Sequence, residues 1–338
     1  MKALLGSLIL LTALSAPAFA GACGLKQIAS IDMTTGPGGR YLVPVSINGA
    51  PQSMLLSTAG GITSLRQDGA DAMGLHPIDA SHVKLLSSNG NASQSYVQMD
   101  FRLGAIDLPR LQAIVMPNAG AGTPPFVGNL AGDILSLYDV EMDFAGRKLN
   151  FFSKDHCPGK VIYWKADAYA MVPITLQIPT GDDSRAGYRV YSYRGSHIHV
   201  PVTINGKDLK AALNTGSPVS TMSTDTAKYM FGVTAESPGA APVQGPGATP
   251  GSFTYTFPTL TFDAVTVTNA KFLVTPNLTG AKDPNNSLRT GTRLFRVDDG
   301  IGGNTTIGLD VLRKLHLYVA YGENKLYITP ASAPSAAQ

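Results

Sequence analysis

The sequence predicts a mostly β protein built from two similar lobes, with a few short helices. The stretch VPVSINGAPQSMLLSTAGG, which begins at Val43, recurs as VPVTINGKDLKAALNTGSP from Val200, so the chain contains an internal duplication. In both copies apolar residues alternate and then reach an Asn-Gly pair, a pattern typical of a β-hairpin. The 338 residues include 36 Gly and 23 Pro and only 14% charged residues, which favours strands and turns over helical bundles.

Each repeat is expected to open with a hairpin, because Asn and Gly both tolerate positive φ in a tight turn. The alternating apolar residues and the turns are Val43, Val45 and Ile47 before Asn48-Gly49, and Val200, Val202 and Ile204 before Asn205-Gly206. Short helical patterns follow at 66–74 and 224–231, and again at 134–138 and 311–315. The pairs Ala145-Gly146 and Gly322-Glu323 predict a final hairpin in each repeat.

The length of 338 residues is sufficient for about two domains. We expect a first lobe over 21–157, a connector over 158–199 with strand-like runs at 161–164 and 172–178, and a second lobe over 200–338. Two stretches rich in Gly and Pro, 235–252 and 276–304, are predicted to be long loops that are either functional or simple surface insertions.

Residues 1–20, MKALLGSLILLTALSAPAFA, have the pattern of a secretory signal peptide. An early Lys2 precedes an apolar stretch, and Ala18-Phe19-Ala20 forms a cleavage site of small residues, so we expect a mature chain that starts near Gly21 in the periplasm or outside the cell. The alternative is a lipoprotein anchored at Cys23, which the Ala at position 20 disfavours. No later apolar run reaches the ~18 residues of a transmembrane helix.

Cys23 and Cys157 are the two cysteines of the chain. In an oxidising compartment we expect them to form a disulfide, and the alternative is two independent thiols. Nothing around either residue indicates an activated thiolate.

Two turns and two apolar segments carry a family resemblance. The turns are Leu55-Leu56-Ser57-Thr58-Ala59 and Ala212-Leu213-Asn214-Thr215-Gly216, and the segments are Leu130-Ala131-Gly132 and Thr306-Ile307-Gly308. In this layout the chain resembles the pepsin-like and retropepsin-like aspartic proteases, in particular the bacterial, exported, two-lobed members. The resemblance implies an all-β, bilobal fold with a cleft between the lobes.

The same resemblance implies that Thr58 and Thr215 hydrogen-bond across the lobe interface. It assigns the supporting positions of the two turns to Thr58, Ala59 and Gly60, and to Thr215, Gly216 and Ser217, and those of the apolar segments to Leu130, Gly132, Ile307 and Gly308. Ala59 stands where the family has Gly, and its Cβ crowds a position at which the backbone comes close to a ligand or to the other lobe.

Family chemistry requires two carboxylates that share one proton and activate a water molecule. Here Ser57 and Asn214 occupy both carboxylate positions. A hydroxyl is too weak a base, and a carboxamide does not titrate in the relevant range. We therefore expect a catalytically silent relative whose cleft binds an extended peptide, with no intact catalytic residue.

Three alternatives remain open. The first is an active peptidase that uses displaced carboxylates, Asp133 or Asp310, although these residues more simply stabilise the starts of short helices. The second is a structural envelope protein that acts through the loops 235–252 and 276–304. The third, Ser57 as a nucleophile, is disfavoured because the surrounding residues do not form a G-x-S-x-G elbow.

No cofactor is expected. His197 and His199 alternate and could face one side of a strand, but two imidazoles without a third ligand make a weak metal site, and an ordinary polar strand edge is the simpler interpretation. The 26 Lys and Arg against 23 Asp and Glu argue against binding of nucleic acid. No Gly-rich phosphate loop with Lys is present. Trp164 is expected to anchor the core of the connector, and nothing indicates the oligomeric state.

Overall fold

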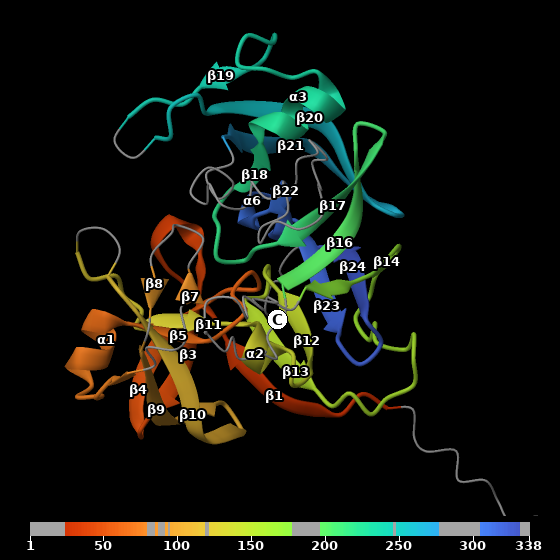
Figure 1. Cartoon of the computed structure of the whole chain (residues 1–338). Coiled ribbons are helices and arrows are strands. Elements are labelled where there is room, and N and C mark those ends of the chain that lie inside the picture. Colours follow the sequence, from red (N-terminus) through yellow and green to blue (C-terminus); the bar gives the residue numbers. More distant parts are fainter. Residues whose placement is uncertain are drawn as a thin grey trace, which may run out of the picture.

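The structure is a computed structural model that describes residues 24–79, 95–118, 122–177, 197–245, 248–276 and 305–331, and the backbone of 85–86 and 92–93. It contains two eight-stranded sheets, each closed on itself, and a six-stranded sheet that joins them (Figure 1). The predicted all-β, bilobal fold with a few short helices is confirmed. The predicted signal peptide and Cys23 lie outside the described residues, so export and the disulfide to Cys157 stay predictions.

The first repeat forms a sheet in the order β2-β3-β4-β11-β5-β10-β9-β6, and pairing of β3 with β9 closes it. Its strands are β2 (Thr34–Thr35), β3 (Tyr41–Ile47), β4 (Ala50–Leu56), β5 (Ser64–Arg66), β6 (Ile78–Asp79), β9 (Ser95–Leu103), β10 (Ile106–Met116) and β11 (Gly128–Leu130). The 3-10 turn η1 (Pro37–Gly39), the helices α1 (Gln67–Ala72) and α2 (Gly132–Leu135), and a separate pair of strands, β7 (Leu85–Leu86) and β8 (Ala92–Ser93), complete this lobe.

The second repeat forms a sheet in the order β15-β16-β17-β22-β18-β21-β20-β19, closed by pairing of β16 with β20. Its strands are β15 (Thr175–Gln177), β16 (His197–Ile204), β17 (Lys207–Leu213), β18 (Ser220–Ser223), β19 (Ala241–Pro242), β20 (Phe253–Phe262), β21 (Val265–Thr275) and β22 (Thr305–Ile307). Its helices are α3 (Thr224–Phe231) and α6 (Leu309–Leu312). The two sheet orders correspond strand by strand, as an internal duplication requires.

The six-stranded sheet contains strands of both repeats and lies where the two lobes meet (Figure 1). Its order is β1 (Gln27–Asp32), β13 (Lys148–Phe152), β12 (Asp139–Asp143), β23 (Leu315–Ala320), β24 (Lys325–Pro330) and β14 (Ala170–Pro173). In its middle, β12 of the first repeat pairs antiparallel with β23 of the second, with Val140 opposite Val319. The lobes are therefore held together by a continuous backbone ladder.

The hairpins that open both repeats form as predicted. At the turns, φ is 50° at Asn48 and 45° at Asn205, and the following Gly49 and Gly206 are at 84° and 74°. Alternation along the strands places Val43, Val200 and their apolar neighbours in the cores of the barrels. The closing hairpins, β12–β13 and β23–β24, also lie where the sequence predicts them.

Other element boundaries differ from the prediction. Helix α3 has the predicted bounds. Helices α2 and α6 begin two residues earlier than expected, because Ala131 and Gly308, which directly follow the strands β11 and β22, are their N-cap residues. Residues 161–164 are not a strand, since Val161 packs against the outer face of the six-stranded sheet instead of joining a ladder. The predicted loop 235–252 contains β19, which pairs with β20. Residues 277–304 lie outside the described part of the chain.

Among the described residues, no helix is long and apolar enough to cross a membrane.

Candidate functional site

The two turns singled out in the sequence lie next to each other between the barrels. Ser57 follows β4, and its amide donates to the carbonyl of Leu130 on β11 at 3.0 Å. Asn214 follows β17, and its amide donates to the carbonyl of Ile307 on β22 at 2.9 Å. In both lobes, a parallel pair of strands thus fixes the residue that begins the turn.

Thr58 and Thr215 lock the turns together through four hydrogen bonds. The Thr58 amide donates to Thr215 Oγ1 at 3.0 Å, and the Thr215 amide donates to Thr58 Oγ1 at 3.1 Å. Each hydroxyl in turn donates to a carbonyl of the other lobe, Thr58 to Leu213 at 2.8 Å and Thr215 to Leu56 at 3.0 Å. Both threonines are buried, so these bonds are shielded from water and hold the turns in one relative position.

Ser57 and Asn214, 157 residues apart, flank one small space above Gly216. A β-carbon placed on Gly216 would lie 3.1 Å from Ser57 Oγ and 3.2 Å from Asn214 Oδ1. Asn214 Oδ1 accepts a hydrogen bond from the Gly216 amide at 2.9 Å. Both side chains are partly exposed. Glycine at 216 keeps this space open, since a methyl group there would crowd both polar groups.

Asp133 lies beneath the first turn and is fully engaged there. It accepts hydrogen bonds from the amide and hydroxyl of Thr63, at 2.9 and 2.7 Å, and from the Ile134 amide at 3.0 Å. Burial raises the pKa of Asp133, and its hydrogen bonds oppose that shift only in part. The carboxylate thus ties the start of α2 to the beginning of β5.

Asp310 plays the same part in the second lobe. It accepts from the Ser220 hydroxyl at 2.7 Å and from the Val311 amide at 3.0 Å. Thr63 and Ser220 are equivalent in the repeat, and both also accept from the backbone, Thr63 from Ala131 at 3.2 Å and Ser220 from Gly308 at 2.9 Å. Thr63 and Ser220 are not among the residues predicted from the sequence, although they are separated by 157 residues, the same offset as the two turns.

These hydrogen bonds correct the alignment of the two apolar segments by one residue. The equivalent of Gly308 is Ala131 and not Gly132, because Ala131 and Gly308 both donate to the repeat-related hydroxyls and both precede a short helix. The matching segments are therefore Asn129-Leu130-Ala131 and Thr306-Ile307-Gly308. Leu130, which the sequence aligned with Thr306, is instead the equivalent of Ile307, since the Leu130 and Ile307 carbonyls accept from the amides of Ser57 and Asn214.

The extra methyl group of Ala131 is accommodated by Gly60. A β-carbon on residue 60 would lie 2.9 Å from Ala131 Cβ, closer than such atoms approach in proteins. In the second lobe the equivalent of Gly60 is Ser217, and Gly308 has no room for a side chain, because its β-carbon would lie 2.3 Å from the Val219 carbonyl oxygen. The two lobes thus solve the same packing problem with different small residues.

His197 and His199 lie on β16, which is an inner strand of its sheet and not the edge strand that the sequence predicts. His199 pairs with Thr175 on β15 and with Ala212 on β17, and His197 pairs with Gln177 on β15. Burial lowers the pKa of both imidazoles. Within the described ranges, no three or more His, Cys, Asp or Glu side chains are grouped so that they could hold a metal ion.

Comparison with known proteins agrees with this arrangement. The family described as aspartyl protease matches residues 43–132 and 200–317, one region in each repeat and together more than half of the chain. The protein therefore belongs to the aspartyl protease family. The solved structure of basic 7S globulin from soybean has a similar fold, with a TM-score of 0.50 and 10% identity over 93% of this chain and 98% of the globulin chain. No curated protein matches.

Proposed function

We propose that this protein is a catalytically silent member of the aspartyl protease family, exported from the cytoplasm, which binds an extended peptide between its lobes. The observation that carries the proposal is the pair of Ser57 and Asn214 above Gly216, a hydroxyl and an amide at the two positions of the family's carboxylates. The cross-lobe hydrogen bonds of the threonines keep the site assembled although the acids are gone.

Hydrolysis by the family's mechanism needs one group that takes a proton from water and another that gives one to the substrate. Each such proton-transfer role contributes roughly 10² to 10⁴ in rate. A neutral serine hydroxyl and a carboxamide fill neither role at moderate pH. Asp133 and Asp310 are both engaged by hydrogen bonds beneath the turns, which favours a structural role for them.

The same groups are well suited to bind a peptide without cleaving it. Asn214 Oδ1 already accepts from Gly216, so the Asn214 amino group remains as a donor, and the Ser57 hydroxyl can donate or accept. A backbone carbonyl is the natural partner of two such neutral donors. Because neither group changes charge, we expect the affinity of an uncharged peptide to be constant between pH 4 and 7.

The proposal is tested by restoring the acids. The variant with Ser57→Asp and Asn214→Asp is expected to bind a statine-containing peptide, which mimics the hydrated carbonyl, at least tenfold more tightly at pH 4 to 5 than the natural chain does. Binding is measured by calorimetry. The matched control carries Ser30→Asp and Asn324→Asp at exposed positions away from the site. No gain over this control would contradict the proposal that an intact site has lost only its acids.

Export and the disulfide are tested on the same preparation. Amino-terminal sequencing of protein from the periplasm or the medium is expected to begin near Gly21, and mass spectrometry is expected to recover Cys23 joined to Cys157. Cytoplasmic protein that retains residues 1–20 would contradict this part of the proposal.

A further inference from the structure

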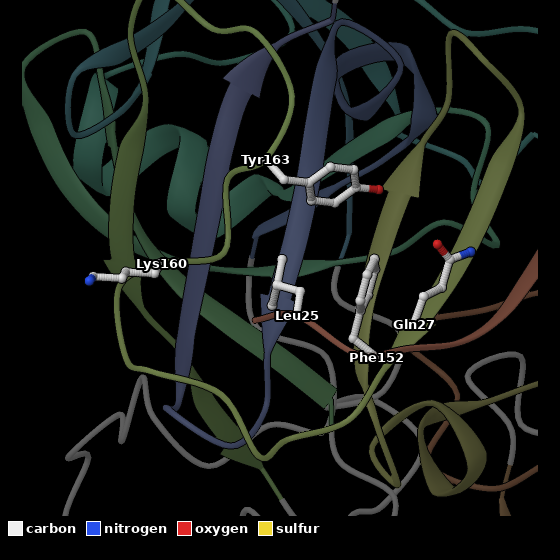
Figure 2. Close-up of a pocket in the computed structure, with 5 residues that line it drawn as sticks. All are labelled: Leu25, Gln27, Phe152, Lys160 and Tyr163. Carbon is white, nitrogen blue, oxygen red and sulfur yellow. The ribbon is translucent and has the colours of Figure 1, made fainter. Parts of the chain in front are cut away.

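The outer face of the six-stranded sheet carries a small core of its own, away from the paired turns. Five buried residues form it: Phe152, Val161, Tyr318, Ala320 and Tyr327. The chain that leaves β13 covers this face, with Ile162 and Trp164 packed against the core. Beside it lies a cavity of about 380 Å³ between Leu25, Gln27, Phe152, Lys160 and Tyr163, in which Lys160 points away from Tyr163 (Figure 2).

His156 links carboxylates from both repeats at this face. Its Nε2 lies 2.5 Å from Asp139 Oδ2 on β12, and its Nδ1 lies 3.8 Å from Glu323 Oε1 in the turn between β23 and β24. The His156 and Asp139 side chains are 1% and 0% exposed. Asp139 Oδ1 also accepts from the Gly322 amide at 2.9 Å, and Glu323 Oε1 accepts from the Gly159 amide at 3.1 Å. The covering chain thus holds one repeat to the other.

Glu141, two residues along β12, forms a second bridge of the same kind. It accepts from Asn150 Nδ2 at 2.8 Å and from the hydroxyl of Tyr163, and its Oε1 lies 2.7 Å from Nε2 of His316 on β23. Trp164 stacks on the His316 ring with centroids 4.1 Å apart, and its Nε1 donates to Thr329 Oγ1 at 3.0 Å. Trp164 anchors the connector, as the sequence predicts. We call His156, Tyr163 and Trp164 the connector clamp.

His156 is the group of the connector clamp whose charge can change near neutral pH. Burial raises the pKa of Tyr163, Tyr318, Tyr321 and Tyr327, so these phenols stay neutral. Lys325 lies 3.6 Å from Glu323 Oε2, which also accepts from the Tyr327 hydroxyl at 2.6 Å. The charged groups that face His156 are Asp139 from β12 and Glu323 from the turn between β23 and β24. Tyr318 and Tyr321 act on Asp139, and Lys325 and Tyr327 contact Glu323.

Loss of the His156 proton would leave Asp139 as a buried carboxylate without a positive partner. A buried charge that loses its partner is strongly destabilising. Burial alone would lower the pKa of His156, but the hydrogen bonds to Asp139 and the Cys157 carbonyl and the charges of Asp139 and Glu323 outweigh it, so the pKa lies above its ordinary value of 6.5. At pH values below the raised pKa of His156, the clamp is therefore closed and its imidazole is charged.

We propose that the connector clamp is a pH-sensitive device that closes over the six-stranded sheet while His156 is charged and opens when His156 loses its proton. The inference is independent of the proposed peptide binding. The closed state holds the His156 proton more tightly than the open state, whose imidazole has the ordinary pKa of 6.5. Between pH 6.5 and the higher pKa of the closed state, the equilibrium constant for opening therefore rises by up to tenfold per pH unit. Above that range the rise ends.

The mature protein provides its own probe, because Trp164 is its single tryptophan. Hydrogen exchange of 156–164, corrected for intrinsic pH dependence, and Trp164 emission are measured from pH 5 to 10. We expect the opening equilibrium to rise with pH, which is observed as faster corrected exchange of 156–164 and a red-shifted Trp164 emission. His156→Gln, which keeps a donor for Asp139 but cannot lose a charge, should abolish the rise, whereas His76→Gln at an exposed position should keep it.

A flat opening curve in the natural protein would overturn the proposal, as would a rise that persists in His156→Gln and disappears only in His316→Gln. Should His156→Gln fail to fold, Glu323→Gln provides a second test. This change removes one negative charge near His156 and so lowers the pKa of His156 in the closed state. The rise of the opening equilibrium should therefore end at a lower pH. An unmoved curve in Glu323→Gln would contradict the device equally.

Discussion

Thr58 and Thr215 exchange reciprocal hydrogen bonds, each hydroxyl accepting from the other residue's amide at 3.0 and 3.1 Å. Each also donates to the lobe opposite its own, so the relationship is symmetric although the neighbouring residues, Ser57 and Asn214, are not alike. The residues that position the two turns, Thr58 and Thr215, are therefore different from the residues at the candidate site, Ser57 and Asn214. In our proposal, this separation allows the site to stay assembled without the acids of the family.

Thr58→Val tests this assembly. The change leaves the Leu213 carbonyl and the Thr215 amide buried without partners, and we expect a loss of about 2 to 4 kcal/mol in the free energy of unfolding. Thr58→Ser keeps the hydroxyl and should cost less than half as much. Urea unfolding of the two variants checks this, and equal stabilities would contradict the account.

Gly60→Ala is expected to destabilise the protein by about 1 to 3 kcal/mol, because its methyl group meets Ala131 Cβ. Ala131→Gly should restore most of this loss in the double variant. The coupling energy from a double-mutant cycle measures the contact directly. A coupling close to zero would show that the crowding lies elsewhere.

Asp133→Asn separates structure from catalysis at the first turn. The NH2 group of an asparagine side chain would face the N–H and O–H donors of Thr63 and Ile134, and two donors cannot form a hydrogen bond. We therefore expect a loss of about 1 to 3 kcal/mol in the free energy of unfolding. Asp310→Asn is the matched change in the second lobe. If either variant instead removes a peptidase activity without loss of stability, the carboxylate is catalytic.

Asp133 also predicts a pH dependence. Because its pKa is raised in the folded state, its contribution to stability is complete below the ordinary value of 3.8 and is lost as pH rises through the folded pKa. Asp133→Asn should remove that part of the stability curve. The comparison is made by urea unfolding between pH 3 and 7.

Glu141 predicts the opposite dependence. Burial would raise its pKa, but hydrogen bonds from His316, Tyr163 and Asn150 outweigh burial, so the pKa is lowered. Its stabilisation is present above the ordinary 4.5 and is lost as pH falls through the folded value. Glu141→Gln should be about 1 to 3 kcal/mol less stable at pH 6, and the difference should shrink below pH 4.5. Asp263→Asn, at an exposed turn, should show no such trend, and thermal unfolding at several pH values distinguishes the two.

The duplication made most of the fold predictable. Asn48-Gly49 and Asn205-Gly206 fix the first hairpins locally, and the repeated turns fix where the lobes meet. The starts of α2 and α6 were less predictable, because they depend on contacts of Asp133 with Thr63 and of Asp310 with Ser220 that join distant parts of the chain. For the same reason the equivalence of Ala131 with Gly308 emerged only from hydrogen bonds.

The connector was the least predictable region. Its residues 161–164 have the composition of a strand, yet they cover the outer face of the six-stranded sheet without pairing with it. The bridges of His156 and His316 to carboxylates depend on strands from both repeats, and no local pattern in the sequence indicates them.

Peptide hydrolysis by the purified protein between pH 3 and 8 tests the central claim most directly. Because we propose that Ser57 and Asn214 stand in place of the family's two carboxylates, we expect no cleavage of a peptide library above the background of the variant that carries Ser57→Ala and Asn214→Ala. Turnover by the natural protein that disappears in this variant would contradict the claim.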